Sequence, residues 1–130
     1  MAHVLIVDDE PDGCEPVARA LGRMGHTVEC ATNGRDALRG LVAGPNPVEL
    51  LILDLRMPEM DGIKLLEILR SYLRWYKLPV IILSAYVNED QAKQARLMGV
   101  WHIFHKTQYA LADLIEAVND LTATGGGGAQ

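Results

Sequence analysis

Short runs of apolar residues recur along this chain, and each run ends at a polar residue. Residues 4–7, 50–53 and 80–83 consist only of Val, Leu and Ile. An apolar run of four that is bounded by turn-forming residues is typical of a strand buried on both faces. The three runs therefore predict the interior strands of a parallel sheet. Residues 26–31, which alternate like a half-covered edge strand, and residues 100–105 predict two more strands.

Segments with apolar residues at helical spacing separate these strands. The first helix is expected to begin late, between Cys14 and Pro16, because proline suits the first helical position and disrupts later turns. Asn33 is expected to cap a helix over residues 34–42. Further helices are predicted from Asp61-Gly62 onward, over residues 88–98, and around an apolar series at residues 111–121.

The third of these helices carries leucine on one face and basic residues elsewhere. Leu65, Leu66, Leu69 and Leu73 are expected to belong to the core. Arg70, Arg74 and Lys77 are expected to form a solvated face.

Strand and helix alternate five times, which predicts an α/β fold. Five such units imply a doubly wound parallel sheet with right-handed crossovers and helices on both faces. In an open sheet of this kind, ligands bind beyond the carboxyl ends of the strands. The polar residues that end the strands are therefore expected to share one crevice.

Composition narrows the class of protein. The chain has 130 residues, of which 49% are apolar and 22% charged, and this fits one globular domain over residues 1–122. The Gly-rich residues 123–130 are expected to form a flexible tail or linker. A net charge of −5 argues against direct binding of nucleic acid. We expect no membrane span and no signal peptide, hence a cytoplasmic protein whose Cys14 and Cys30 are free thiols.

The residues at the strand ends suit a divalent cation and a phosphoryl group. Asp8 and Asp9 follow the first strand, Asp54 follows the third, Ser84 the fourth and Lys106 the fifth. Two carboxylates about 4 Å apart repel each other by roughly 4 kcal/mol at an effective dielectric constant near 20. A cation in the crevice, or solvation of the loops, would relieve this repulsion.

The chain resembles the receiver domain of two-component response regulators from His3 to about Leu121. The matching pieces, in chain order, are Val7-Asp8-Asp9-Glu10, Ala31-Thr32-Asn33-Gly34 with Ala37-Leu38, Asp54-Leu55-Arg56-Met57-Pro58-Glu59-Met60-Asp61-Gly62, Leu83-Ser84-Ala85, and Gly99 seven residues before Lys106. The stretch from Asp54 to Gly62 is fairly specific, and the ordered set is very specific.

The resemblance implies a flavodoxin-like three-layer sandwich with five strands in the order 2-1-3-4-5. It implies a phosphorelay signalling domain, not an enzyme, although such a domain catalyses its own phosphorylation and dephosphorylation. Asp54 would take a phosphoryl group from the phosphohistidine of a histidine kinase or a phosphotransfer protein, while Ser84 and Lys106 would bind phosphoryl oxygens. Mg²⁺ would be held by Asp8, Asp9, Asp54 and the backbone carbonyl of Arg56. The signal would pass to a second copy or a downstream effector through the surface of the fourth helix, fifth strand and fifth helix.

Two positions depart from the family pattern. Thr107 stands where the family usually has a proline in a cis bond, so we expect a trans bond, because a cis bond to a non-proline residue costs about 2.5–4 kcal/mol. Ile103 stands where the family usually has a Tyr or Phe that swings inward after phosphorylation. Isoleucine is stiff and too short for that movement, so these changes favour a weak switch or a receiver fold that binds partners without phosphorylation.

Two enzyme and cofactor classes fit less well. A haloacid-dehalogenase-like phosphatase would have a second aspartate two residues after its nucleophile, and Arg56 occupies that position. A flavodoxin would have a Ser/Thr/Gly-rich phosphate loop after the first strand, whereas the acidic residues 8–10 would repel a phosphate.

Overall fold

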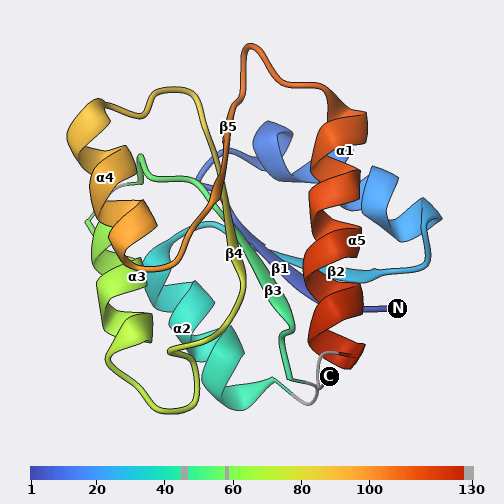
Figure 1. The fold of residues 1–130 in the computed structure, drawn as a ribbon, viewed down its shortest axis with the longest axis horizontal. Helices are drawn as coiled ribbons and strands as arrows, with labels where there is room; N and C mark the ends of the chain where they lie inside the picture. Colours follow the sequence, from blue (N-terminus) through green and yellow to red (C-terminus); the bar gives the residue numbers. More distant parts are fainter. Residues whose placement is uncertain (45–46, 58, 128–130) are drawn as a thin grey trace.

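A five-stranded parallel sheet forms the middle layer of the molecule (Figure 1). The computed structural model describes residues 1–44, 47–57 and 59–127. The strands are β1 (His3–Val7), β2 (Thr27–Ala31), β3 (Leu50–Leu53), β4 (Val80–Ser84) and β5 (His102–His105). Their order in the sheet is β2-β1-β3-β4-β5, and every neighbouring pair is parallel. The predicted fold class and strand order are confirmed.

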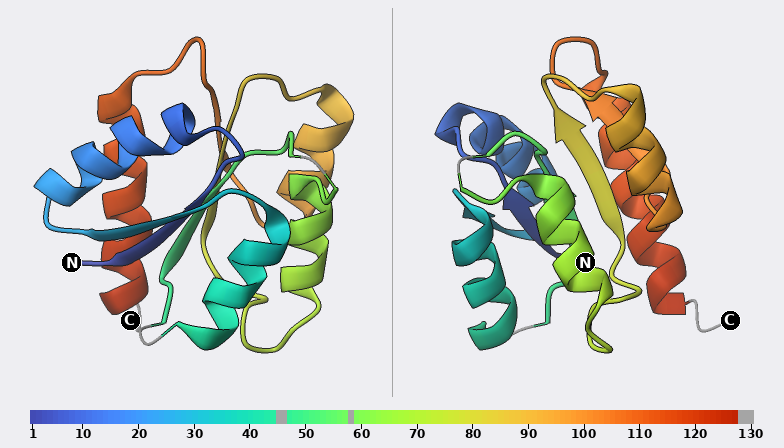
Figure 2. Two further views of the ribbon diagram at one scale, coloured as in Figure 1. Left: turned by 180° about the vertical axis from the view of Figure 1, so that it is seen from behind. Right: turned by 90° about the vertical axis from the view of Figure 1, so that its left-hand side faces the viewer.

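Helices cover both faces of this sheet. They are α1 (Pro11–Arg23), α2 (Gly34–Ala43), α3 (Gly62–Arg70), α4 (Glu89–Leu97) and α5 (Leu111–Gly127). Helices α1 and α5 pack on one face, and α2, α3 and α4 pack on the other (Figure 2). Helix α5 includes residues 123–127, which the sequence analysis assigned to the flexible tail. The remaining tail residues, 128–130, and Pro58 lie outside the described residues.

The core consists of two apolar clusters, one on each side of the sheet. Every residue of β1, β3 and β4 is buried, whereas the edge strand β2 is mostly exposed. Burial of one Leu or Ile side chain stabilises a fold by about 1.5–3 kcal/mol, so the three interior strands hold the sheet rigidly. The residues that follow the carboxyl ends of these strands are therefore held in fixed positions. Within the described residues, no helix has the length and apolar character needed to cross a membrane.

The beginning of α1 differs from the prediction. The helix begins at Pro11 and contains Asp12 to Pro16, so the expectation of a late start was wrong. Pro11 occupies the first turn, where a missing N–H costs nothing. Pro16 removes one hydrogen bond, toward the carbonyl of the exposed Asp12. Burial of Cys14 and Val17 against the sheet holds the helix together across that gap.

The α3 region corrects two further expectations. Helix α3 ends at Arg70, so Leu73 leaves the leucine face and is 88% exposed instead of lying in the core. Arg70 is not part of a solvated face. Its guanidinium donates to the carbonyl oxygens of Met98 at 2.8 Å, Trp75 at 3.0 Å and Leu78 at 2.9 Å.

The cysteines are paired instead of free. A disulfide joins Cys14 in α1 to Cys30 in β2, with 6.3 Å between their Cα atoms. The two residues are 16 positions apart in sequence. Their proximity arises only when α1 folds back over the sheet, which a reading of cysteine spacing along the chain did not reveal.

Candidate functional site

Three carboxylates meet at the carboxyl ends of β1 and β3. One oxygen of each of Asp8, Asp9 and Asp54 lies within 4.8 Å of the others. Asp8 and Asp54 are buried and Asp9 is exposed. Hydrogen bonds to the sheet fix the backbone of Asp8 and Asp54. Asp8 N–H donates to the carbonyl of Ala31 at 3.0 Å, and Asp54 N–H donates to the carbonyl of Val7 at 2.9 Å.

Ser84 and Lys106 complete the group from β4 and from the end of β5. The Ser84 hydroxyl donates to Asp54 Oδ1 at 2.6 Å, and Lys106 Nζ donates to Asp54 Oδ2 at 3.0 Å. Lys106 Nζ also lies 2.7 Å from Asp8 Oδ2. The position of the lysine follows from the sheet, since Lys106 N–H donates to the carbonyl of Ser84. The structure thus brings together all the side chains that the sequence assigned to one crevice.

Burial and charge act on the ionisation of this group. Burial, opposed by the bonds from Lys106 and Glu10 N–H, raises the pKa of Asp8. Burial by itself would lower the pKa of Lys106, but its hydrogen bonds to Asp8 and Asp54 outweigh burial and raise that pKa. Lys106 therefore stays protonated at neutral pH and serves as a fixed positive charge beside Asp54.

Two glycines let backbone approach these carboxylates. A Cβ atom at Gly13 would collide with the side chain of Asp8. A Cβ atom at Gly62 would lie 2.5 Å from the backbone oxygen of Asp54 and 2.7 Å from Leu55 Cα. Both helices, α1 and α3, thus begin packed directly against the site, which a larger residue at either position would prevent.

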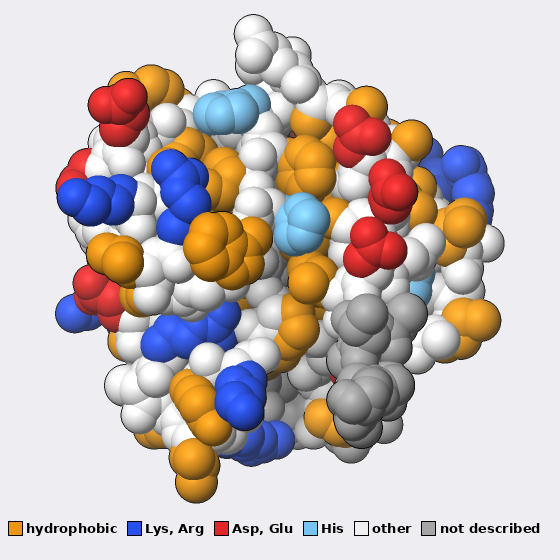
Figure 3. All heavy atoms as spheres, in the orientation of Figure 1, with side chains coloured by type: hydrophobic (Ala, Val, Ile, Leu, Met, Phe, Trp, Pro, Cys, Tyr) orange, Lys and Arg blue, Asp and Glu red, His pale blue; other side chains and the backbone are white. Residues whose placement is uncertain are grey.

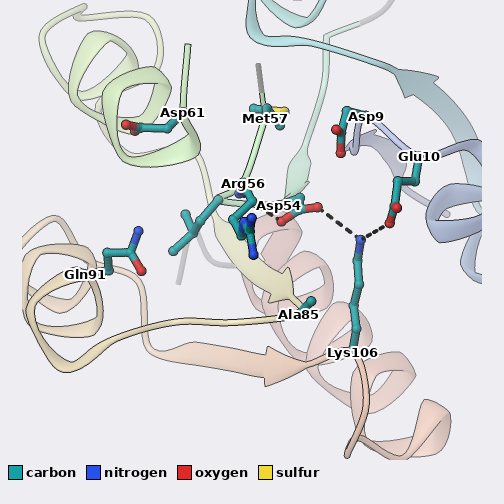
Figure 4. A pocket seen from close by; sticks show the side chains of 10 residues that line it. Asp9, Glu10, Asp54, Arg56, Met57, Asp61, Ala85, Gln91 and Lys106 are labelled. Carbon is teal, nitrogen blue, oxygen red and sulfur yellow. Dashed lines mark hydrogen bonds and ion pairs between the residues drawn. The ribbon is translucent and has the colours of Figure 1, made fainter. Parts of the chain in front are cut away.

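An open cleft of about 590 Å³ lies over Asp54. Figure 4 shows Lys106 reaching from one side toward both Asp54 and Glu10, with Asp61 and Gln91 on the opposite side. Glu10 Oε1 is 3.6 Å from Lys106 Nζ, a contact that sequence reasoning missed although Glu10 continues the acidic run. Gln91 and Met57 also line the cleft, and no local pattern marks either of them.

The donor set fits a magnesium ion. Mg²⁺ prefers carboxylate and carbonyl oxygens and retains several waters. Three clustered carboxylates face a single lysine, so the group holds more negative than positive charge. Arg56, whose carbonyl the family resemblance implied as a further ligand, lines the same cleft, and its N–H donates to Asp54 Oδ1 at 3.1 Å.

The two departures from the family pattern flank Lys106 in the sequence, Ile103 three residues before it and Thr107 directly after it. Ile103 is half-buried and packs against the apolar cluster on the α4 side of the sheet. No cis peptide bond occurs among the described residues, so the expected trans bond before Thr107 is confirmed. Trp101, near the beginning of β5, is 72% exposed.

Comparison with known proteins gives consistent matches. The family model described as "Response regulator receiver domain" matches residues 4–119. The regulatory protein AtoC of Escherichia coli strain K12 is 40% identical over 99 residues, which are 76% of this chain and 21% of AtoC. The transcriptional regulatory protein KdpE of Mycobacterium tuberculosis strain H37Rv is 39% identical over 95 residues, which are 73% of this chain and 40% of KdpE.

A solved structure agrees in shape over nearly the full length. The crystal structure of a response regulator receiver protein from Pseudomonas putida superposes with a TM-score of 0.84 at 28% sequence identity. The match covers 92% of this chain and 96% of that one. By contrast, the chain spans less than half the length of AtoC and KdpE.

Proposed function

This chain belongs to the response regulator receiver domain family of two-component systems, and we propose that its Asp54 accepts a phosphoryl group from a phosphohistidine. The donor is a histidine kinase or a phosphotransfer protein. The single observation that carries this proposal is the arrangement around Asp54, whose two oxygens are held by Ser84 and Lys106 and whose carboxylate clusters with those of Asp8 and Asp9.

The transfer is a displacement at phosphorus. An oxygen of the Asp54 carboxylate forms the new P–O bond while the P–N bond to the donor imidazole breaks, and the imidazole leaves with the bonding electron pair. Such a reaction depends on positioning and on neutralising the charge of the phosphoryl oxygens. Lys106 and Ser84, which now hold Asp54, are placed to transfer their hydrogen bonds to those oxygens.

Asp8, Asp9, Asp54 and the carbonyl of Arg56 would hold Mg²⁺. When bound, the ion supplies further positive charge to the phosphoryl oxygens. Asp8 Oδ2 lies 2.7 Å from Lys106 Nζ, and this contact would have to weaken for Asp8 to hold the ion. Mg²⁺ would therefore bind weakly in the absence of a phosphoryl group.

The output surface is the face formed by α4, β5 and α5. Trp101 lies on it and is exposed together with Leu97 and Leu111. Figure 3 shows both basic and acidic side chains over α4 and a column of acidic ones over α5. This face would bind a downstream effector or a second copy of the domain, in the cytoplasm, where receiver domains meet their kinases.

Replacement of the acceptor tests the proposal. We expect Asp54→Asn to abolish Mg²⁺-dependent labelling by phosphoramidate, because an amide cannot serve as the nucleophile. Asp36→Asn, at an exposed carboxylate of α2 that does not line the cleft, should be labelled like the wild type. Intact-protein mass spectrometry measures the added phosphoryl group, and circular dichroism checks the fold. Labelling of Asp54→Asn to the wild-type extent would overturn the assignment.

A second function has a specific observation in its favour. Ile103 packs into the core cluster where the family usually carries a ring that moves, and Thr107 follows Lys106. These residues favour a receiver fold that binds a partner without phosphorylation. Failure of the wild type to become labelled, with partner binding retained, would support this second function.

A further inference from the structure

The loop between α3 and β4, residues 71–77, exposes apolar and aromatic side chains. Leu73 is 88% exposed, and Tyr72 and Tyr76 are also exposed. In Figure 3, hydrophobic and basic side chains lie next to one another at the lower edge of the molecule, where Figure 1 draws this loop. Clustered exposed apolar residues, unlike single ones, mark interaction surfaces.

Two cations of this loop have aromatic rings as neighbours instead of carboxylates. The Arg74 guanidinium lies 5.2 Å from the Trp75 ring centroid, and Lys77 Nζ lies 5.5 Å from that of Tyr76. Within the described part of the chain, neither cation forms an ion pair with an acidic residue. The loop is therefore a positive spot on a chain of net charge −5.

The loop is held in this shape before any partner binds. Arg70 donates to the carbonyl oxygens of Trp75 and Leu78 at 3.0 and 2.9 Å. The rings of Tyr72 and Trp75 meet edge to face, with their centroids 5.5 Å apart. A surface that is already ordered loses little conformational entropy on binding, which favours its use as a docking site.

A hollow of about 540 Å³ lies beside the loop, at the amino ends of β3 and β4. Asp54 follows the opposite, carboxyl end of β3, so the hollow and the phosphoryl site lie at opposite ends of the sheet. Arg74 and Lys77 line the hollow, together with the carboxylate residue Glu49, which accepts a hydrogen bond from His3 N–H. Its apolar lining includes Leu41, Val48, Trp75, Leu78 and Leu121.

We propose that this hollow and the loop of residues 71–77 form a docking site for a short acidic segment of a partner protein. An apolar side chain of the segment would enter the hollow, and its carboxylates would pair with Arg74 and Lys77. Two cations beside an apolar hollow complement a segment with few acidic residues. A nucleic acid carries a negative charge at every phosphate, so the net charge of −5 on this chain would repel it more strongly than a segment with only a few carboxylates. The site acts independently of Asp54.

Selection of binders from a displayed library of random peptides tests the proposal on the complete chain. We expect the enriched peptides to be acidic with at least one aromatic or aliphatic anchor. Their affinity, measured by fluorescence anisotropy, should fall by about tenfold or more in the double variant Arg74→Glu, Lys77→Glu, because both contacts become repulsive. The matched control is Arg19→Glu, Arg23→Glu on α1, which makes the same charge change at exposed positions and should bind as the wild type does.

Other results would overturn the proposal. These are an absence of enriched peptides, equal loss of affinity in both double variants, or full affinity in the loop variant. Preferential binding of single-stranded oligodeoxythymidine that the loop variant loses would identify a nucleic-acid site instead. Self-association in gel filtration that the loop variant loses would identify a second copy as the occupant. Labelling by phosphoramidate should stay at the wild-type rate in the loop variant, so docking and phosphorylation are tested separately.

Discussion

At the residue scale, Gly13 is important because its backbone packs against the Asp8 carboxylate and leaves no room for a side chain. We predict that Gly13→Ala displaces that carboxylate, lowers the free energy of unfolding by about 1–3 kcal/mol and weakens Mg²⁺ binding. Gly22→Ala in the same helix is the control. A Cβ atom there meets nothing within 4 Å, so this variant should gain about 0.5–1 kcal/mol. Urea unfolding and calorimetric titration with Mg²⁺ measure both effects, and equal behaviour of the two variants would contradict the packing argument.

Arg70 also acts at the scale of one residue. Arg70 is the last residue of α3, and its guanidinium donates to three backbone carbonyl oxygens, two after α3 and one at the end of α4. These hydrogen bonds connect the three segments. Arg70→Met keeps the apolar stem and removes the donors, so we predict a loss of about 2–4 kcal/mol in the free energy of unfolding. Arg39→Met, which removes only an exposed ion pair with Asp36 at 3.4 Å, should change it by less than about 0.5–1 kcal/mol. An equally small loss in Arg70→Met would refute this role.

At the scale of elements, the disulfide between Cys14 and Cys30 ties α1 to the edge strand β2. Closing a loop of this length restricts the unfolded chain, and the double variant Cys14→Ser, Cys30→Ser should lose about 3 kcal/mol of unfolding free energy. Dithiothreitol should destabilise the wild type similarly and leave the variant unaffected. Thiol titration of the unfolded, untreated protein gives an independent check, since two reactive thiols per chain would show that the bond had not formed.

At the scale of the whole molecule, phosphorylation of Asp54 would transmit a signal only if it changed the face of α4, β5 and α5. A signal needs an element whose two states the phosphoryl group stabilises differently. Ile103 is packed in the core cluster and is too short and stiff to move between two sites. We therefore expect any communication to run through Ser84, Ala85 and the following residues 86–89. This arrangement implies a face that changes little on phosphorylation.

Trp101 provides the test of that expectation. It is 72% exposed, and tryptophan is favoured at the centre of interfaces. We predict that Trp101→Ala weakens partner binding or self-association by about tenfold or more, with and without a phosphoryl mimic such as beryllofluoride. Unchanged association in both states would remove Trp101 from the interface. A large shift of the wild type caused by the mimic would contradict the weak switch.

Local sequence patterns were sufficient for the architecture and for predicting which polar side chains gather at one end of the sheet. Residues 4–7, 50–53 and 80–83 could be assigned to buried strands because a short continuous apolar run is typical of a strand that is covered on both faces. Asp54, Ser84 and Lys106 could be grouped because parallel strands place their carboxyl ends at one edge. The receiver motifs supplied the strand order.

What only the tertiary structure decided concerns contacts between residues far apart in sequence. Cys14 bonds to Cys30 because α1 packs across the sheet. Arg70 can donate a hydrogen bond to the Met98 carbonyl because the end of α4 packs beside the end of α3. Leu73 is exposed because α3 ends three residues before it, and the periodicity of the leucines did not mark that end. Hydrophobic periodicity reports which face of an element is buried. Distances between elements depend on how whole layers pack, which the pattern within any one segment does not contain.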